Sequence, residues 1–264
     1  MGSSISIITI NFNNSPGLKR TIESVRSQSS TQLEYIIIDG GSTDGSAQVI
    51  KTNADLANYW VSEKDYGIYH AMNKGIARAT GDYLLFLNSG DYFYKPGVLQ
   101  ALLDNGQGAE IIYGDLVVSG AGGKRTKVHP ATLTFDFFLR DSLPHPATLI
   151  KRTLFDRVGL YNEDNRIISD WEFFTHAVCR FNATYHHVPL EIAVFAEDGL
   201  SADPANSDKI WAEKMEVFSR YYAAFLPDYR KMEEYRSSLN LIRHSTLHRL
   251  ADKIQGSAIA KLLK

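Results

Sequence analysis

The stretch YLLFLNSGD, residues 83–91, changes abruptly from apolar to polar. Its first five residues form a continuous apolar run, which is typical of a strand covered on both faces in a parallel sheet. Ligands bind such sheets beyond the carboxyl ends of the strands, where Asn88, Ser89, Gly90 and Asp91 follow. The same residue types are common in plain turns, so the stretch alone leaves a binding site and a surface turn both open.

The segments before this stretch alternate strand and helix signals. Short apolar runs at Ile5–Ile10, Tyr35–Ile38 and Tyr59–Val61 predict three more strands. Apolar residues that recur every three or four positions between these runs predict helices, for example Ile68, Met72 and Ile76. Strands that alternate with helices at this spacing predict an α/β fold, with a mostly parallel sheet and helices on both faces.

Composition narrows the class of protein. The chain has 264 residues, of which 44% are hydrophobic and 22% charged, and its formal net charge of -2 argues against nucleic acid as the main partner. Cys179 is the only cysteine, so no intrachain disulfide and no cysteine-based zinc cluster can form, which suits a reducing compartment. No apolar run approaches the roughly 18 residues of a membrane span, and no secretory signal pattern begins the chain. We therefore expect a cytoplasmic protein of enzyme size.

Polar clusters follow three of the predicted strands, at Thr9–Asn13, Asp39–Asp44 and Asn88–Asp91. Parallel strands place these ends at one edge of the sheet. No GxGxxG follows the first strand, and no GxxxxGK[ST] occurs anywhere. Carboxylates at two strand ends suit a sugar nucleotide, because one can accept hydrogen bonds from the base or ribose and another can hold a divalent cation that neutralises a diphosphate.

Four segments of the chain, in order, resemble the motifs of family 2 glycosyltransferases of GT-A fold. They are Ser6–Asn13, Ile37–Ser46, Ser62–Ile76 and Gly81–Asp91. The resemblance covers about residues 5–200 and is closest to the bacterial subgroup that builds surface polysaccharides such as colanic acid.

The resemblance implies a domain plan. A GT-A glycosyltransferase domain would occupy residues 1–204, with a nucleotide-sugar-binding half at 1–115 and an acceptor half at 116–204. A C-terminal helical extension would occupy residues 205–264.

The resemblance also implies roles for residues around a nucleotide-sugar donor. Asp39 matches the carboxylate that accepts a hydrogen bond from the base, usually uracil. Lys74 could face the diphosphate or could be an ordinary solvated helix lysine. The expected nucleotide-sugar-binding residues are Thr9, Asn11, Asn13, Asp39, Asp65, Asn73, Lys74, Asn88, Ser89 and Asp91.

One departure from the family pattern concerns the metal. Family members commonly carry a DxD-type run where this chain has Asn88-Ser-Gly-Asp91. Gly90 has no side chain to ligate a metal, and Asn88 offers only a neutral amide oxygen. Asp91 is therefore the one carboxylate of this run available to Mn²⁺ or Mg²⁺, and a hard cation can bind through one carboxylate completed by water and substrate phosphates. We expect a divalent cation as cofactor.

The second half of the resemblance concerns the acceptor. His145 lies between two prolines in a segment that borders the sugar pocket in the family, although a core histidine fits the sequence as well. Asp170 matches the catalytic base of the ED-type motif, and Trp171 would border the acceptor. Glu172 competes for the role of base, since alternation on a strand would send both carboxylates to one face, whereas on a helix they would diverge. Asp170 could instead only cap a helix at 171–178.

Three further segments of the chain bear on this interpretation. Asp198-Gly-Leu-Ser201 resembles a family loop that could close over the donor. Residues 211–225 have helical spacing and are followed by Pro227. From Leu239 to Lys264 the chain has five Lys or Arg against one Asp, with apolar residues on one face. That pattern fits a helix packed on the catalytic domain or an interfacial helix at the inner face of the cell membrane.

The sequence therefore predicts an inverting glycosyltransferase of the hexosyltransferase type. It would move a sugar from a nucleotide diphosphate sugar, most simply a UDP-sugar, to a hydroxyl of a glycan or lipid-linked glycan in surface polysaccharide synthesis. One alternative is a nucleotide-sugar-binding protein without transfer activity, which the altered DxD run favours. Another is a nucleotidyltransferase, which would need a basic phosphate-binding loop where Asn11–Gly17 has no basic residue.

Overall fold

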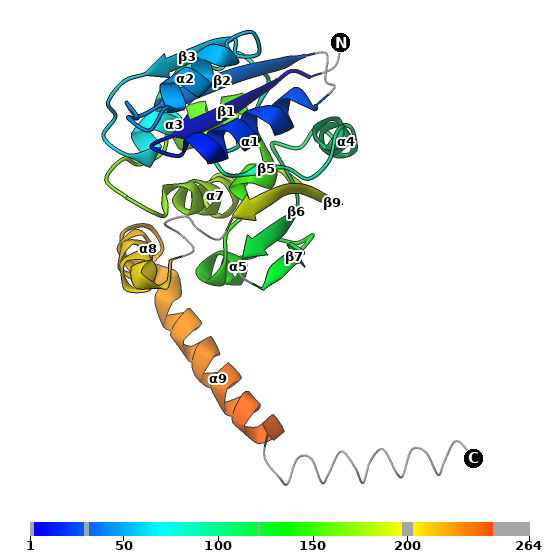
Figure 1. Ribbon diagram of the computed structural model, residues 1–264. Coiled ribbons are helices and arrows are strands. Elements are labelled where there is room, and N and C mark those ends of the chain that lie inside the picture. The colour runs from blue at the N-terminus through cyan, green and yellow to red at the C-terminus, as the bar shows by residue number, and fades with distance from the viewer. Residues whose placement is uncertain (1–2, 29–31, 121, 197–202, 245–264) are drawn as a thin grey trace, which may run out of the picture. The chain divides into compact units, whose positions relative to one another are not determined.

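The computed structural model describes residues 3–28, 32–120, 122–196 and 203–244 (Figure 1). The chain divides into two compact units, Met1–Ile210 and Trp211–Lys264. The predicted boundary after residue 204 stays a prediction. The loop Asp198–Ser201 and the C-terminal residues 245–264 lie outside the described residues.

Within the described residues, nine strands of the first unit form one sheet in the order β3-β2-β1-β4-β8-β6-β9-β5, with β7 paired to β6. The strands are β1 (Ile5–Asn11), β2 (Leu33–Asp39), β3 (Tyr59–Ser62), β4 (Tyr83–Phe86), β5 (Tyr92–Phe93), β6 (Ile111–Gly120), β7 (Gly123–Lys127), β8 (Thr148–Lys151) and β9 (Tyr185–Ala196). The strands β3, β2, β1 and β4 are parallel, whereas β8 pairs antiparallel with both β4 and β6. The predicted α/β fold with a mostly parallel sheet is confirmed.

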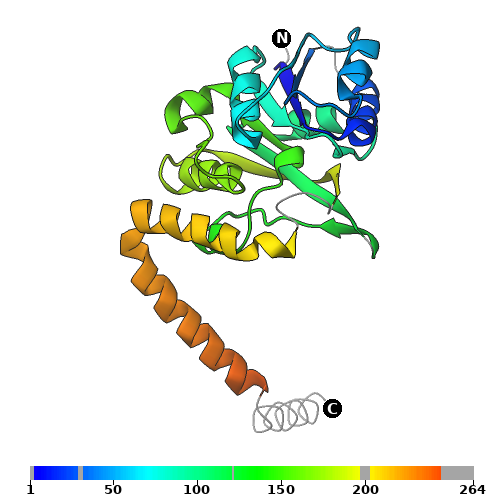
Figure 2. The same ribbon diagram turned by 60° about the vertical axis from the view of Figure 1, so that its left-hand side comes forward.

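Helices cover both faces of this sheet (Figures 1 and 2). The apolar side chains of β1 alternate between two cores, with Ile8 and Ile10 on one face and Ile5 and Ile7 on the other. The first face packs against α3 (Ile68–Arg78), α5 (Phe135–Arg140), α6 (Arg152–Val158) and α7 (Ser169–Cys179). The second packs against α1 (Ser15–Arg26), α2 (Ser46–Thr52) and α4 (Val98–Asn105). Because both faces are buried, β4 reads as a continuous apolar run in the sequence.

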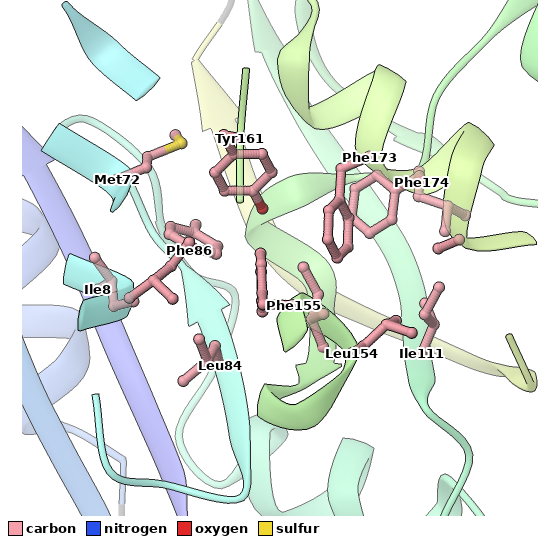
Figure 3. Close-up of a cluster of buried hydrophobic side chains, with 14 of the residues drawn as sticks. Ile8, Met72, Leu84, Phe86, Ile111, Leu154, Phe155, Tyr161, Phe173 and Phe174 are labelled. Carbon is pink, nitrogen blue, oxygen red and sulfur yellow. The ribbon is translucent and has the colours of Figure 1, made fainter. Parts of the chain in front are cut away.

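An aromatic cluster fills the first core beneath the acceptor half (Figure 3). The ring of Tyr161 lies 5.4 Å from that of Phe86 and 5.6 Å from that of Phe155, between centroids. Phe155 stacks on Phe173 of α7 at 4.5 Å. These contacts fix α7 against the central strands, so the residues at the start of α7 have a defined position relative to β4.

The second unit is helical in its described part. Helix α8 (Ser207–Tyr221) begins in the first unit after a 3-10 turn at Pro204–Asn206, and a second 3-10 turn, Ala223–Phe225, leads to α9 (Leu226–His244). Pro227 lies in the first turn of α9, where its missing N–H leaves no intrahelical bond unmade. Among the described residues, no helix is long and apolar enough to cross a membrane.

Candidate active site

A cavity of about 610 Å³ lies at the carboxyl ends of the parallel strands. One side is formed by residues that follow β1, β2, β3 and β4, and the other by residues before and within α7 and at the end of β9. Its walls include seven of the residues that the sequence predicts for the site, namely Asn11, Asp65, Asn88, Ser89, Asp91, His145 and Asp170. The structure thus joins the predicted nucleotide and acceptor halves in one cavity.

The loop that follows β4 is held from below by side chains of α1 and its cap. Asn14 Nδ2 donates to the Ser89 carbonyl at 3.1 Å, and Thr21 Oγ1 donates to the Asp91 carbonyl at 2.6 Å. Arg20 Nη2 donates to the Gly90 carbonyl at 2.6 Å. Gly90 has a φ of 109°, which a residue with a Cβ rarely adopts. The backbone of this loop is therefore fixed independently of any ligand, and so is the position of Asp91.

The oxygen donors of this loop fit one hard divalent cation. Asp91 is 6% exposed, lines the cavity, and accepts a long hydrogen bond of 3.4 Å from the Ala196 backbone N–H. Asn88 Oδ1 is buried without a hydrogen-bond partner among the described residues, so it has a lone pair to offer. Over the same residues no group of three or more His, Cys, Asp or Glu could hold a metal ion. A cation here would need water and phosphate oxygens to complete its shell.

Asp39 does not line the cavity in this structure, and its expected role as the acceptor for the base stays a prediction. The carboxylate is fully buried and its oxygens accept four hydrogen bonds, from Asn11 Nδ2 at 2.6 Å, Ser42 Oγ at 2.6 Å, Ser42 N at 3.0 Å and Ser62 Oγ at 2.5 Å. Burial alone would raise the pKa of Asp39, but these hydrogen bonds outweigh it and lower the pKa below its ordinary value. Asp39 ties the ends of β1, β2 and β3 together.

Asp65 and Phe12 occupy the part of the cavity beside β2. Asp65 Oδ1 accepts from the Gly67 N–H at 3.0 Å, and its other oxygen lies against Gly40. A Cβ built on Gly40 would be 2.6 Å from Asp65 Oδ2 and 3.2 Å from a ring carbon of Phe12, so only glycine lets both side chains approach this backbone. Phe12 is 65% exposed at the cavity wall, and the sequence reasoning did not single it out.

Asp170 lies at the opposite wall, in the first turn of α7. Its Oδ1 is 2.8 Å from the hydroxyl of Tyr69, which donates to it, and its Oδ2 is 3.9 Å from Nδ1 of His145. His145 Nε2 is 2.8 Å from the hydroxyl of Tyr161. Burial lowers the pKa of His145 to about 4, although the Asp170 charge opposes the shift. His145 is therefore neutral near pH 7.

The helical geometry of α7 separates Asp170 from the two residues that follow it. Positions two apart on a helix point roughly 200° apart, so Glu172 turns into the protein, where its Oε2 accepts from Asn165 Nδ2 at 2.7 Å and Asn162 Nδ2 at 3.2 Å. Trp171 is 2% exposed and its Nε1 donates to the Phe138 carbonyl at 2.6 Å. Both side chains are thus turned away from the cavity, and the expectation that they border the acceptor stays a prediction.

Four other predicted residues also lie outside the cavity wall. Thr9 is fully buried and its Oγ1 donates to the Leu87 carbonyl at 2.8 Å, and Asn73 Nδ2 donates to the Tyr161 carbonyl at 2.9 Å. Lys74 forms an ion pair with Glu63. The exposed Asn13 accepts from the Thr43 N–H at 2.9 Å. In this structure all four hold neighbouring segments together, and their assignment as direct donor contacts stays a prediction.

The cavity is also lined by residues that the sequence reasoning missed, among them Phe12, Tyr69 and Arg166. Tyr69 belongs to the apolar face of α3. Nothing in the sequence indicated that its hydroxyl donates a hydrogen bond to Asp170, a residue 101 positions away. A sequence signal did exist for Phe12, because an aromatic residue between polar positions at the end of a buried strand is a candidate for ligand contact.

Comparison with known proteins places the chain among sugar transferases. Residues 6–168 match the family described as glycosyl transferase family 2. The chain is 38% identical over 180 residues to an uncharacterized glycosyltransferase of Mycobacterium tuberculosis, covering 66% of this chain and 68% of the relative. It is 29% identical over 175 residues to a PGL/p-HBAD biosynthesis glycosyltransferase of Mycobacterium bovis, covering 64% of this chain and 67% of the relative.

Two solved structures share the fold. TarS 1-349 of S. aureus in complex with UDP-GlcNAc gives a TM-score of 0.61 at 17% identity, covering 74% of this chain and 59% of TarS. This chain thus spans less than two thirds of that protein. The mannosyltransferase PcManGT from Pyrobaculum calidifontis, in complex with GDP-Man and Mn²⁺, gives a TM-score of 0.56 at 17% identity, covering 100% of this chain and 87% of that one. The predicted GT-A fold is confirmed.

Proposed function

The chain belongs to glycosyl transferase family 2, and we propose that it is an inverting hexosyltransferase that moves a sugar from a UDP-sugar to a hydroxyl of a glycan or lipid-linked glycan. The observation that carries this proposal is the placement of Asp91 and Asp170 in the walls of one cavity, on segments from opposite halves of the domain. Family membership argues against the nucleotidyltransferase alternative.

The donor fits the wall formed by the strand ends. We assign the base to the space beside Phe12, whose exposed ring offers a stacking surface. We assign to Asp65 the hydrogen bond from the base that was first expected of Asp39. The Asp65 carboxylate lines the cavity beside Phe12. UDP as the carrier is supported by the TarS complex, although the PcManGT complex holds a GDP-sugar.

The diphosphate would lie toward the loop after β4. Asp91 would hold a divalent cation there together with the amide oxygen of Asn88, as the Mn²⁺ in the PcManGT complex suggests. Such a cation would neutralise the negative charge that develops on the departing nucleotide diphosphate.

Asp170 supplies the base that inversion requires. The acceptor hydroxyl must attack the anomeric carbon from the face opposite the nucleotide, and its proton must leave as the new bond forms. The side chain of Asp170 is 25% exposed, so it is open to an acceptor, whereas the side chain of Glu172 is 9% exposed and bonded to asparagines. Asp170 is therefore the better candidate of the two carboxylates.

The acceptor and location remain part of the proposal. A lipid-linked glycan in surface polysaccharide synthesis would bring the enzyme to the inner face of the cell membrane. Residues 239–264, with their excess of basic residues, would then give a peripheral contact with anionic lipid from the cytoplasm.

Paired substitutions test the base. The full chain would be incubated with UDP-glucose, UDP-galactose, UDP-GlcNAc and GDP-mannose in Mn²⁺, with p-nitrophenyl glycosides as acceptors, and released nucleotide diphosphate measured. Asp170→Asn should lower the rate by about 10² to 10⁴ with UDP binding intact, as expected for a lost general base. Glu172→Gln should keep the rate and lose stability, because it disturbs the bonds to Asn162 and Asn165.

The outcomes separate the alternatives. A near-normal rate in Asp170→Asn with a collapsed rate in Glu172→Gln would move the base to Glu172. A wild-type chain that is stabilised by donor yet releases no nucleotide would be a binding protein. Proton NMR of the transferred sugar gives its anomeric configuration, and retention of the donor configuration would refute the inverting mechanism.

A further inference from the structure

Tyr69 is the second residue of α3 and contacts the proposed base, which lies 101 positions later in the chain. Its side chain is 4% exposed and lines the cavity. The hydroxyl lies 2.8 Å from Oδ1 of Asp170 and 2.7 Å from the carbonyl oxygen of Ile167. The hydroxyl has one proton and two acceptor oxygens within hydrogen-bonding distance, so it can donate to Asp170 or to the Ile167 carbonyl.

The hydroxyl of Tyr69 stays protonated. Burial, and then the negative charge of Asp170, raise the pKa of Tyr69 well above its ordinary value. Its ring is held by packing, with its centroid 5.7 Å from that of Tyr161. Tyr69 is thus a permanent donor on a fixed ring.

The two oxygens of Asp170 have different surroundings. Oδ1 accepts from Tyr69, whereas Oδ2 has no hydrogen-bond partner among the described residues. Nδ1 of His145 lies 3.9 Å from Oδ2, which is too long for a direct hydrogen bond. Tyr161 faces His145 and does not contact Asp170 by a hydrogen bond in the described part of the chain.

We propose that Tyr69 is a positioning residue for the transfer step: its hydroxyl holds Oδ1 of Asp170 and leaves Oδ2 as the oxygen that receives the acceptor proton. This inference rests on the proposed function, in which Asp170 is the base. It assigns a role to a residue that the sequence marked only as part of a helix face.

Tyr69 has a second hydrogen-bond acceptor, the Ile167 carbonyl, which it can use when the charge of Asp170 changes. In the transfer step the O–H bond of the acceptor hydroxyl breaks and its proton goes to Oδ2 of Asp170. The acceptor oxygen bonds to the anomeric carbon, while the bond from that carbon to the nucleotide diphosphate breaks and its electron pair leaves with the nucleotide diphosphate. Asp170 is then neutral and Oδ1 is a weaker acceptor. The hydroxyl proton of Tyr69 can turn to the Ile167 carbonyl at 2.7 Å, so it keeps a hydrogen bond in both states.

Tyr69→Phe in the full chain tests the proposal, because it removes the hydroxyl and keeps the ring. With the donors and acceptors named above, kcat should fall about 10- to 100-fold, the range of one hydrogen bond to a charged group, while KM for the donor stays unchanged. In an Asp170→Asn background, Tyr69→Phe should cause no further loss.

Tyr83→Phe is the matched control. Tyr83 is 3% exposed and its hydroxyl donates to the Ala109 carbonyl at 2.8 Å, outside the cavity wall. Both variants lose one buried tyrosine hydroxyl, so both should lose some thermal stability. Only Tyr69→Phe should lower kcat with KM unchanged.

Each outcome decides the matter. A wild-type kcat in Tyr69→Phe would overturn the inference while the proposed function stands, as would an equal loss of kcat in Tyr83→Phe. Additive losses in the double variant would mean that Tyr69 acts elsewhere than through Asp170. If Asp170→Asn transfers sugar at the normal rate, or the wild type releases no nucleotide, the proposed function fails and takes this inference with it.

Discussion

Asp39→Asn would disturb a single buried carboxylate that joins three strand ends. The amide keeps the shape of the side chain but removes its charge and replaces one oxygen with an NH₂ group. Two of the four donors to Asp39 are N–H groups, Asn11 Nδ2 on Oδ1 and the backbone N–H of Ser42 on Oδ2, and the backbone group cannot reverse. If Oδ1 becomes the amide nitrogen, Asn11 can offer its own oxygen only by turning its NH₂ away from Ser42 Oγ, to which it donates at 3.2 Å, so in either case one donor loses its acceptor.

The expected loss of stability follows from these hydrogen bonds to Asp39. One buried donor without a partner costs about 1 to 3 kcal/mol, and the bonds that survive lose a charged acceptor, a difference of about 1 kcal/mol each. Some of these donors are only half-buried, so we expect a decrease of about 3 kcal/mol in the free energy of unfolding. That corresponds to a shift of the urea midpoint on the order of 1 M.

Urea unfolding of the wild type and Asp39→Asn at several pH values measures the effect. Because the pKa of Asp39 is lowered in the folded state, its stabilisation is present above the unfolded pKa near 3.8 and is lost as the pH falls through the folded pKa. The difference in the free energy of unfolding between the two proteins should therefore be constant from about pH 8 to 5 and decrease below about pH 4.

Asp55→Asn serves as the control, since Asp55 makes only an exposed ion pair with Arg26 and its loss should leave the urea midpoint nearly unchanged. UDP affinity should fall in Asp39→Asn together with stability, because the strand ends that form the cavity wall are loosened. A gap below about 0.5 kcal/mol at pH 7 would refute the four-donor arrangement. Loss of UDP affinity with unchanged stability would instead restore Asp39 as a direct contact to the base.

The remaining predictions concern the metal and the C-terminus. Asp91→Ala should abolish both donor turnover and the Mn²⁺-dependent thermal stabilisation by UDP, and full activity of the wild type in excess chelator would contradict a metal role. Full-length protein should bind vesicles that contain anionic lipid in a salt-sensitive way, with about 1 kcal/mol per basic residue near the surface. A chain of residues 1–238 should not bind them, and equal binding of both proteins would rule out a contact through 239–264.

The parallel strands and the edge that carries the site could be predicted from the sequence. A strand buried on both faces is apolar at most positions, which makes runs such as Tyr83–Leu87 easy to recognise. The polar residues after such strands are placed by the backbone, because the carboxyl ends of parallel strands meet at one edge. For that reason Asn11, Asn88 and Asp91 were found in the cavity wall as predicted.

The rotation of α7 could not be read in the same way. Residues on every side of this helix are buried, among them Trp171, Glu172, Phe174 and Thr175. A helix buried all round has no polar stripe that marks its outer face. Only packing, such as the stacking of Phe155 on Phe173, fixes which residues of α7 turn toward the cavity and which turn away.

The sequence by itself determined the α/β fold, the family and the edge of the sheet where the cavity lies, since these depend on local periodicity and on residues close together in the chain. Tertiary structure alone decided which carboxylates are available. Asp39 is saturated by donors from three strand ends, Glu172 is paired with asparagines, and Asp170 keeps one oxygen open beside Tyr69. Hydrogen bonds between residues far apart in the chain make this choice, because they form only when packing brings donor and acceptor within about 3 Å.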